Sequence, residues 1–443
     1  MGVDYSCLLC GWSLGGNQDS DKYRMVPPFF LLTMKKYLLL CLVAFQISHA
    51  YGVTKVNVNG VFYNLTPEKV GTAEVTYGSS DYSGAIVIPE TIEYDNYSYK
   101  VTSIGKYAFQ YSKITSIDIP SSISVIGSYA FDHCTDINEV RIHSLQAWCE
   151  IQFGSNPLLY AKSLLLNGEI IRELVVPEQI TRISNHAFYN YQALTSVKIT
   201  KNIKAIGEYA FSKCPSLNSV VIDEGVDTIY KYAFSECVSL TTVKLSNTLN
   251  IGQYVFSGCS SLSSLNLPEN IQAVNHGLCN NCTSLQSVYI PKSVLAIGDY
   301  AFRGCEKLKT IYITENVLGM GSSSFGNCEN ITDVYCYAMT PPIPISTYYK
   351  KGINDFFLNS YINYSTLHVP QSSIEKYKNA FSWSDFGNIV ALTEEDTGVT
   401  TERINVNNIK DFYSIDGRHL DVPHKGINIV KMANGRTKKV IIK

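Results

Sequence analysis

Apolar positions recur through the middle of this chain in one short phrase, which appears nine times between Ile104 and Phe325. The clearest copy runs Ile206-Gly207-Glu208-Tyr209-Ala210-Phe211 and continues with Cys214, Leu217, Val220 and Ile222. The aromatic position of the phrase falls at Phe109, Phe131, Phe188, Phe211, Phe234, Phe256, Cys279, Phe302 and Phe325. From Phe188 onward, successive copies are 22 or 23 residues apart. A period this short and regular predicts a solenoid, in which each unit buries its apolar residues against its neighbours.

Each unit ends in the pattern Leu-x-x-Val-x-Ile, as in Leu217, Val220 and Ile222. The alternation predicts a short strand with one face inward. Stacking one strand per unit gives a parallel sheet with rungs about 4.8 Å apart. The Ile-Gly-x-Tyr-Ala-Phe segment should return the chain along the opposite side in short helical or irregular turns. We expect its Ala and Phe to face the core and its Gly to permit the tight bend.

The repeats define a solenoid over residues 101–340, and other patterns flank it. Residues 51–100 predict an N-terminal β cap, and residues 341–392 predict a C-terminal cap with a loop at 345–361, a strand at 366–370 and a helix at 374–380. A polar linker, 393–403, precedes a tail of residues 404–443. In that tail, Asn434-Gly435 between two apolar runs predicts a small β-hairpin. Caps are expected because an open solenoid end exposes its core.

The start of the chain carries a targeting pattern. Met34-Lys35-Lys36 is followed by an apolar run over residues 37–47 and then by Ser48-His49-Ala50. A positive segment, an apolar run and a small-x-small end predict a secretory signal peptide at residues 34–50, with residues 1–33 as a mis-annotated extension. The apolar run is too short for a transmembrane span. We therefore expect a protein that is secreted or held at the outer cell surface.

Charge and composition narrow the possible partners. The formal net charge is −2, and no dense basic patch is evident, which argues against nucleic acid as a partner. Tyrosine is abundant, with 31 copies. Tyrosine combines a rigid contact surface with a polar tip, which suits binding, but it is also a favourable strand residue. The tyrosine content fits both interpretations.

The phrase Ile-Gly-x-x-Ala-Phe-x-x-Cys-x-x-Leu resembles the BspA-like (Treponema pallidum-type) leucine-rich repeat family of bacterial surface proteins, over about residues 101–334. The resemblance implies a mainly β leucine-rich-repeat solenoid and a recognition role at the cell surface. The stretch from Leu145 to Pro177, with Trp148-Cys149, departs from the plain repeat and resembles a variant unit of that family. The last 32 residues or so resemble the end of the C-terminal sorting domains of type IX secretion in Bacteroidetes, which implies a sorting or anchoring role.

Seven cysteines occupy one equivalent position in the repeats: Cys134, Cys214, Cys237, Cys259, Cys282, Cys305 and Cys328. One cysteine per rung in a line cannot supply the tetrahedral ligand set of zinc. Parallel, in-register side chains also give a poor disulfide torsion. We expect buried thiols that act as small apolar residues. Cys279 and Cys282 form a C-x-x-C pair, but no thioredoxin-like pattern surrounds it.

No catalytic motif stands out. The eight histidines are scattered, and the chain contains no Gly-x-Ser-x-Gly, His-Glu-x-x-His, phosphate-loop or EF-hand pattern. We therefore expect a non-enzymatic protein without a metal or cofactor.

Two tyrosine columns arise from the repeat. The first precedes the Ala-Phe pair on the return turns and comprises Tyr107, Tyr129, Tyr209, Tyr232, Tyr254 and Tyr300; we interpret it as a structural cover of the core. The second lies at the outward strand position and includes Tyr289, Tyr312 and Tyr335, preceded toward the N-terminus by Lys244, Lys198 and Arg141. These six residues are our candidate ligand-binding site, because sheet faces of solenoids commonly bind partners. The alternative is a ladder that only stabilises the sheet.

The resemblance implies an adhesin whose sheet face binds a host extracellular-matrix protein, another bacterium's surface protein or a glycan. A different hypothesis is a structural or scaffolding surface protein without a host ligand. A scaffold should self-associate as its concentration rises, whereas a glycan-binding protein should lose sugar retention when the tyrosine ladder is removed.

Overall fold

The computed structural model describes residues 53–66, 71–78, 82–247, 250–345, 355–393, 396, 409–414, 418–420, 426–432 and 437–442. The predicted N-terminal extension and signal peptide lie outside these residues. Lys55–Lys443 form one compact unit. No helix among the described residues is long and apolar enough to cross a membrane.

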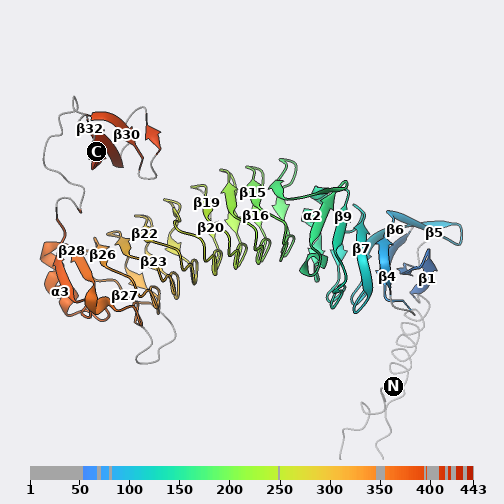
Figure 1. The fold of residues 1–443 in the computed structure, drawn as a ribbon, viewed down its shortest axis with the longest axis horizontal. Helices are drawn as coiled ribbons and strands as arrows, with labels where there is room; N and C mark the ends of the chain where they lie inside the picture. Colours follow the sequence, from blue (N-terminus) through green and yellow to red (C-terminus); the bar gives the residue numbers. More distant parts are fainter. Residues whose placement is uncertain are drawn as a thin grey trace, which may run out of the picture. The chain divides into compact units, whose positions relative to one another are not determined.

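The repeat units stack as coils of a β-solenoid, whose longer strands form parallel sheets on one side (Figure 1). One sheet comprises β4 (Ser83–Val87), β7 (Lys113–Ile119), β9 (Glu139–Ile142), β11 (Ser163–Leu166) and β12 (Glu169–Ile170), of which only β12 is antiparallel to its neighbour. The next comprises β13 (Glu173–Val175), β15 (Ser196–Ile199), β17 (Ser219–Ile222) and β19 (Thr242–Lys244). The third comprises β22 (Ser287–Ile290), β24 (Thr310–Ile313), β26 (Asp333–Cys336), β28 (Thr366–Val369) and β29 (Asn388–Ala391). The predicted solenoid with a parallel sheet along one side is confirmed.

The return segments also pair. Most contain a two-residue strand, and these strands stack in parallel into a second ladder. They are β8 (Val125–Ile126) and β10 (Gln152–Phe153), then β14 (Arg182–Ile183), β16 (Ala205–Ile206), β18 (Thr228–Ile229) and β20 (Asn250–Ile251), then β21 (Ala273–Val274), β23 (Ala296–Ile297), β25 (Gly319–Met320) and β27 (Ile343–Pro344). The expected irregular returns are therefore partly strand, because equivalent Ile positions of adjacent coils, such as Ile206 and Ile229, lie in register.

The expected role of the repeat glycine needs correction. The bend is made by the tyrosine two residues later, since Tyr209 has φ 54° and Tyr232 has φ 59°. Gly207 is needed for close approach instead. A Cβ there would lie 2.5 Å from the backbone nitrogen of Asn185 in the preceding coil. Coils stacked at strand spacing leave no room for a side chain at that point.

The core is a column of stacked aromatic rings, with the repeat Ala and Phe facing inward as predicted. Phe211 is fully buried. Its ring lies 5.1 Å from that of Phe188 and 5.2 Å from that of Phe234, nearly parallel to both. Phe357 continues the column beyond Phe325, at 5.8 Å, so residues from the predicted 345–361 loop form part of a further coil.

The cysteine column is buried, and its described members are free thiols. Each thiol reaches back to a main-chain carbonyl of the preceding coil: Cys237 Sγ donates to the Phe211 carbonyl oxygen at 3.1 Å. Ser360 occupies the equivalent place in the last coil, and its Oγ donates to the Phe325 carbonyl oxygen at 2.7 Å. Burial raises the pKa of Cys214 and Cys259, which keeps these thiols protonated and unreactive. The cysteine column therefore links each coil to the main chain of the preceding coil by buried hydrogen bonds.

Both solenoid ends are covered. At the N-terminal end, β1 (Thr54–Val58), β2 (Val61–Leu65) and β3 (Gly71–Thr76) lead to β6 (Tyr97–Ile104), on which β5 (Thr91–Tyr94) folds back. At the other end lie 3₁₀ turns η2 (Ile362–Tyr364) and η3 (Gln371–Ser373) and helix α3 (Ile374–Lys378), and the ring of the buried Trp383 lies 5.3 Å from that of Tyr377 in α3. The predicted strand and short helix of this cap are confirmed.

The variant unit keeps its place in the stack. It contains helix α2 (Leu145–Glu150) and 3₁₀ turn η1 (Pro157–Leu159). The buried Trp148 donates from Nε1 to the Ala187 carbonyl oxygen at 2.9 Å, which fixes this unit to the next coil.

The tail forms a small antiparallel sheet of β30 (Ile409–Tyr413), β31 (His419–Leu420), β32 (Gly426–Met432) and β33 (Thr437–Ile442). β32 and β33 pair as the predicted hairpin, while its Asn434-Gly435 turn lies outside the described residues.

Candidate functional site

The outer face of the third sheet carries the predicted tyrosine ladder. Tyr289 pairs in register with Tyr312, and Tyr312 pairs with Tyr335. Each side chain alternates with buried neighbours on its strand and is half-buried. The repeat period therefore places the three tyrosines on consecutive rungs of one surface.

The ladder continues onto a residue that the repeat pattern did not include. His368 of β28 pairs in register with Tyr335, and the two rings stack at 4.2 Å. Tyr312 and Tyr335 stack at 5.0 Å with 12° between their planes. Sequence reasoning recognised the strand Thr366–Val369 but missed this histidine, because the step from Tyr335 to His368 is longer than the 23-residue period. The alternation Leu367-His368-Val369 was the available signal.

The predicted basic residues lie apart from the tyrosines. Lys198 and Lys244 occupy outward positions on either side of Val221 in the second sheet. Lys198 Nζ lies 3.8 Å from Asp223 Oδ2, an exposed pair that contributes little to stability. Arg141 belongs to the first sheet, where it contacts Glu139. The six candidate residues thus fall on three separate sheets rather than one continuous site.

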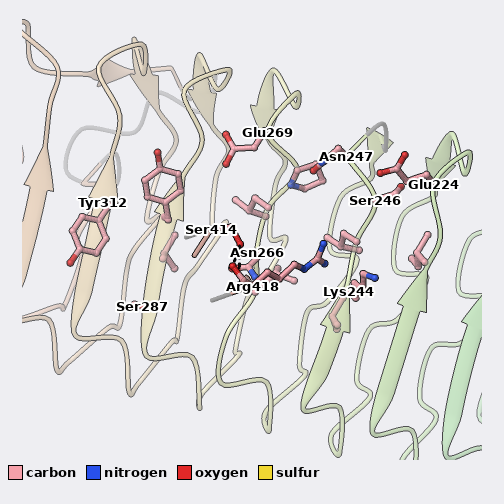
Figure 2. A pocket seen from close by; sticks show the side chains of 18 of the residues that line it. Glu224, Lys244, Ser246, Asn247, Asn266, Glu269, Ser287, Tyr312, Ser414 and Arg418 are labelled. Atoms are coloured by element: carbon pink, nitrogen blue, oxygen red, sulfur yellow. Dashed lines mark hydrogen bonds between the residues drawn. The ribbon is translucent and has the colours of Figure 1, made fainter. Parts of the chain in front are cut away.

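A discontinuity separates the lysines from the tyrosines. Residues 262–268, which the repeat pattern predicts to contain a strand, have no regular secondary structure, so the sheets end at β19 and resume at β22. Val243 and Leu265, whose equivalents are buried in neighbouring coils, are only partly buried here. Figure 2 shows the hollow on this face, lined by Lys244, Asn266 and Tyr312 and also by Ser414 and Arg418.

The tyrosine ladder lies in a negative environment. Burial, and then the charges of Glu269 and Glu315, raise the pKa of Tyr289 to about 12. Burial, followed by Asp333 and Asp396, raises the pKa of Tyr335 to about 12. Burial also raises the pKa of Tyr337, two residues along the same face. These phenols stay neutral hydrogen-bond donors at physiological pH.

His368 and Tyr337 connect the ladder to nearby carboxyl groups. His368 Nε2 lies 3.0 Å from Asp333 Oδ1, and its Nδ1 lies 4.0 Å from Asp396 Oδ2. The Tyr337 hydroxyl donates to the Asp396 carbonyl oxygen at 2.8 Å. The end of the ladder is therefore held by polar contacts, while its middle remains half-exposed.

Within the described part of the chain, no group of three or more His, Cys, Asp or Glu side chains could hold a metal ion. The surface offers aromatic edges, hydroxyls and carboxylates, which suit non-covalent recognition.

The stacked tyrosines of the return turns form a second column, in which Tyr209, Tyr232 and Tyr254 are half-buried. Tyr209 lies 4.8 Å from Tyr232, and Tyr232 lies 5.0 Å from Tyr254, with planes within 7°. Gly277 interrupts this column, and a Cβ there would meet the Tyr254 ring at 2.0 Å. Their positive φ angles and mutual stacking agree with a structural role.

The chain matches the sequence model of one protein family. Residues 90–158, 165–276, 246–354 and 275–391 match the BspA type leucine rich repeat region, in six copies. No curated protein matches the chain.

Several solved structures are similar in fold. A leucine rich cell surface protein from Faecalibacterium prausnitzii is 22% identical, covering 66% of this chain and 96% of that one, with a TM-score of 0.35. The pneumococcal vaccine antigen PcpA is 17% identical, covering 77% and 99%, with a TM-score of 0.44. The Treponema pallidum leucine rich repeat protein is 24% identical, covering 40% and 75%, with a TM-score of 0.29. Because the family match extends over more than half of the sequence, the chain belongs to the BspA-type leucine-rich repeat family.

Proposed function

We propose that this protein is an exported, non-enzymatic adhesin that binds a macromolecular partner through the outer face of its third sheet. The observation that carries the proposal is the register-matched column of the half-buried Tyr289, Tyr312 and Tyr335, which continues onto His368. The predicted signal peptide at residues 34–50 and the family of surface proteins support export.

Rigid aromatic side chains are common anchors of protein interfaces, because they bury a large area at little cost in conformational entropy. A purely structural ladder would contribute roughly 0.2–1 kcal/mol for each cross-strand pair. The buried residues of each coil are sufficient to form the fold. The fold therefore does not require tyrosine at the outward position of three consecutive strands.

Ring geometry favours a protein partner over a glycan. Sugars stack on the open faces of aromatic rings, whereas Tyr312, Tyr335 and His368 cover one another's faces. They present ring edges and polar atoms to solvent. Such a surface suits hydrogen bonds with a protein better than sugar stacking.

The test is binding of the protein to immobilised extracellular-matrix proteins, to bacterial surface proteins and to a glycan array, beside a Tyr289→Ala/Tyr335→Ala variant. The matched control is Tyr230→Ala/Tyr364→Ala, which removes two exposed tyrosines elsewhere. Circular dichroism verifies that each variant remains folded.

Binding that is lost in the site variant and kept in the control supports the proposal. Binding kept by both variants refutes this face as the site. Absence of binding together with concentration-dependent self-association in size-exclusion chromatography would instead favour the structural, scaffolding function.

A further inference from the structure

The surroundings of the tyrosine ladder are strongly acidic. Asp333 lies two residues before Tyr335 on β26 and on the same outward face. Glu269 and Glu315 influence Tyr289, and Asp333 and Asp396 influence both Tyr312 and Tyr335. Carboxylates from several successive coils therefore converge on one aromatic surface.

Few cations balance these charges. Lys292 Nζ lies 2.8 Å from Glu315 Oε1, and within the described residues no other lysine pairs with any of the four carboxylates. Arg418 lines the same hollow as Glu269 and Tyr289. The side chains of Glu315 and Asp333 are 43% and 37% exposed, so a partner can reach them. The surface thus holds an excess of negative charge that is accessible from solvent.

Resting on the proposed function, we propose that the partner presents a basic protein segment to this face, with arginine or lysine side chains on Glu269, Glu315 and Asp333 and its remaining atoms against the tyrosine edges. A guanidinium group has five donors in one plane, which match carboxylate and phenol oxygens. Complementary charge also accelerates association and excludes wrong partners.

The same charges disfavour an anionic partner. A sulfated glycan or an acidic peptide would bring like charge onto several carboxylates, and such contacts cost free energy. The exposed lysines Lys198 and Lys244 lie in the second sheet, beyond the discontinuity at residues 262–268, and do not neutralise the ladder.

The test measures binding of a fluorescent oligoarginine peptide to the full chain by anisotropy, with oligoglutamate and heparin as opposite-charge probes. The site variant is Glu269→Gln/Glu315→Gln/Asp333→Asn, which preserves side-chain shape. The control variant, Glu178→Gln/Asp227→Asn/Glu236→Gln, removes the same charge from exposed ion pairs elsewhere. A Tyr289→Phe/Tyr335→Phe variant removes hydroxyls and keeps the rings.

We expect oligoarginine to bind and the site variant to weaken binding by about tenfold or more, with the control close to the wild type. Binding should also weaken as salt increases, because exposed charges are screened. Equal losses in the site and control variants would show an effect of net charge alone and overturn the proposal, as would preference for oligoglutamate or heparin.

The outcome separates this inference from the proposed function. If the Tyr→Ala variant loses a natural partner while oligoarginine fails to bind the wild type, the adhesin face stands and its basic-partner chemistry is wrong. If the Tyr→Ala variant binds a natural partner as well as the wild type does, the proposed function itself fails, whether or not oligoarginine binds.

Discussion

Replacing Phe211 with alanine should destabilise the solenoid more than the same change at Phe302, although both side chains are buried at equivalent positions. Phe211 stacks on a ring in each adjacent coil, at 5.1 and 5.2 Å. Phe302 stacks on Phe325 at 5.2 Å, while the preceding coil places Cys279 where the other ring would lie. The two sites therefore differ by one stacked pair.

The magnitude follows from burial plus stacking. A buried Phe→Ala substitution costs about 3–5 kcal/mol of unfolding free energy. A stacked pair contributes about 0.5–1.5 kcal/mol beyond the area that it buries. Phe211→Ala should therefore exceed Phe302→Ala by about 0.5–1.5 kcal/mol.

Urea unfolding followed by circular dichroism measures both losses, with the denaturant slope checked for unchanged cooperativity. Phe211→Leu is the control, because it retains apolar volume and removes only the ring stacking. Equal losses for the two alanine variants would refute the reasoning, since they would show that stacking adds nothing to burial.

Three further predictions concern the same coils. Gly207→Ala should cost about 1–3 kcal/mol by clashing with the preceding coil's backbone, and a thermal midpoint equal to the wild type would exclude that clash. Cys237→Ala should cost about 0.5–1.5 kcal/mol more than Cys237→Ser, because only serine keeps a donor for the Phe211 carbonyl; equal urea midpoints would contradict this. The Tyr289 pKa, raised by folding to about 12, should make stability fall as pH rises from about 10 to about 12, since the unfolded phenol loses its proton first. Tyr289→Phe should flatten that fall in thermal midpoint, and an unchanged slope would count against the shift.

Local alternation and period were sufficient to predict much of the candidate site. Tyr289, Tyr312 and Tyr335 each lie between two apolar strand positions, so inward packing of those neighbours forces the tyrosines outward. A constant step between copies then places them side by side. The same reasoning predicted the buried Phe and Cys columns, because every unit repeats the same contacts.

Other features depended on contacts that no single repeat contains. His368 pairs with Tyr335 although the two are 33 residues apart in the chain, so the 22- or 23-residue period does not predict its place in the ladder. Asp396 approaches Tyr337 and His368 from beyond the last strand. The separation of Arg141 from the tyrosines likewise follows from where the sheets end.

The repeat period, the inward and outward positions and therefore the solenoid can be predicted from the amino-acid order alone, because each unit buries its apolar residues against its neighbours. The different roles of Gly207, which permits close approach, and Tyr209, which makes the bend, become visible only in the folded protein, because stacking sets the backbone conformation and the distance between coils. Tertiary contacts alone also bring the carboxylates of separate coils onto one aromatic face. Negative charge accumulates beside the tyrosine ladder because residues that are far apart in the chain become neighbours when the strands of successive coils pair.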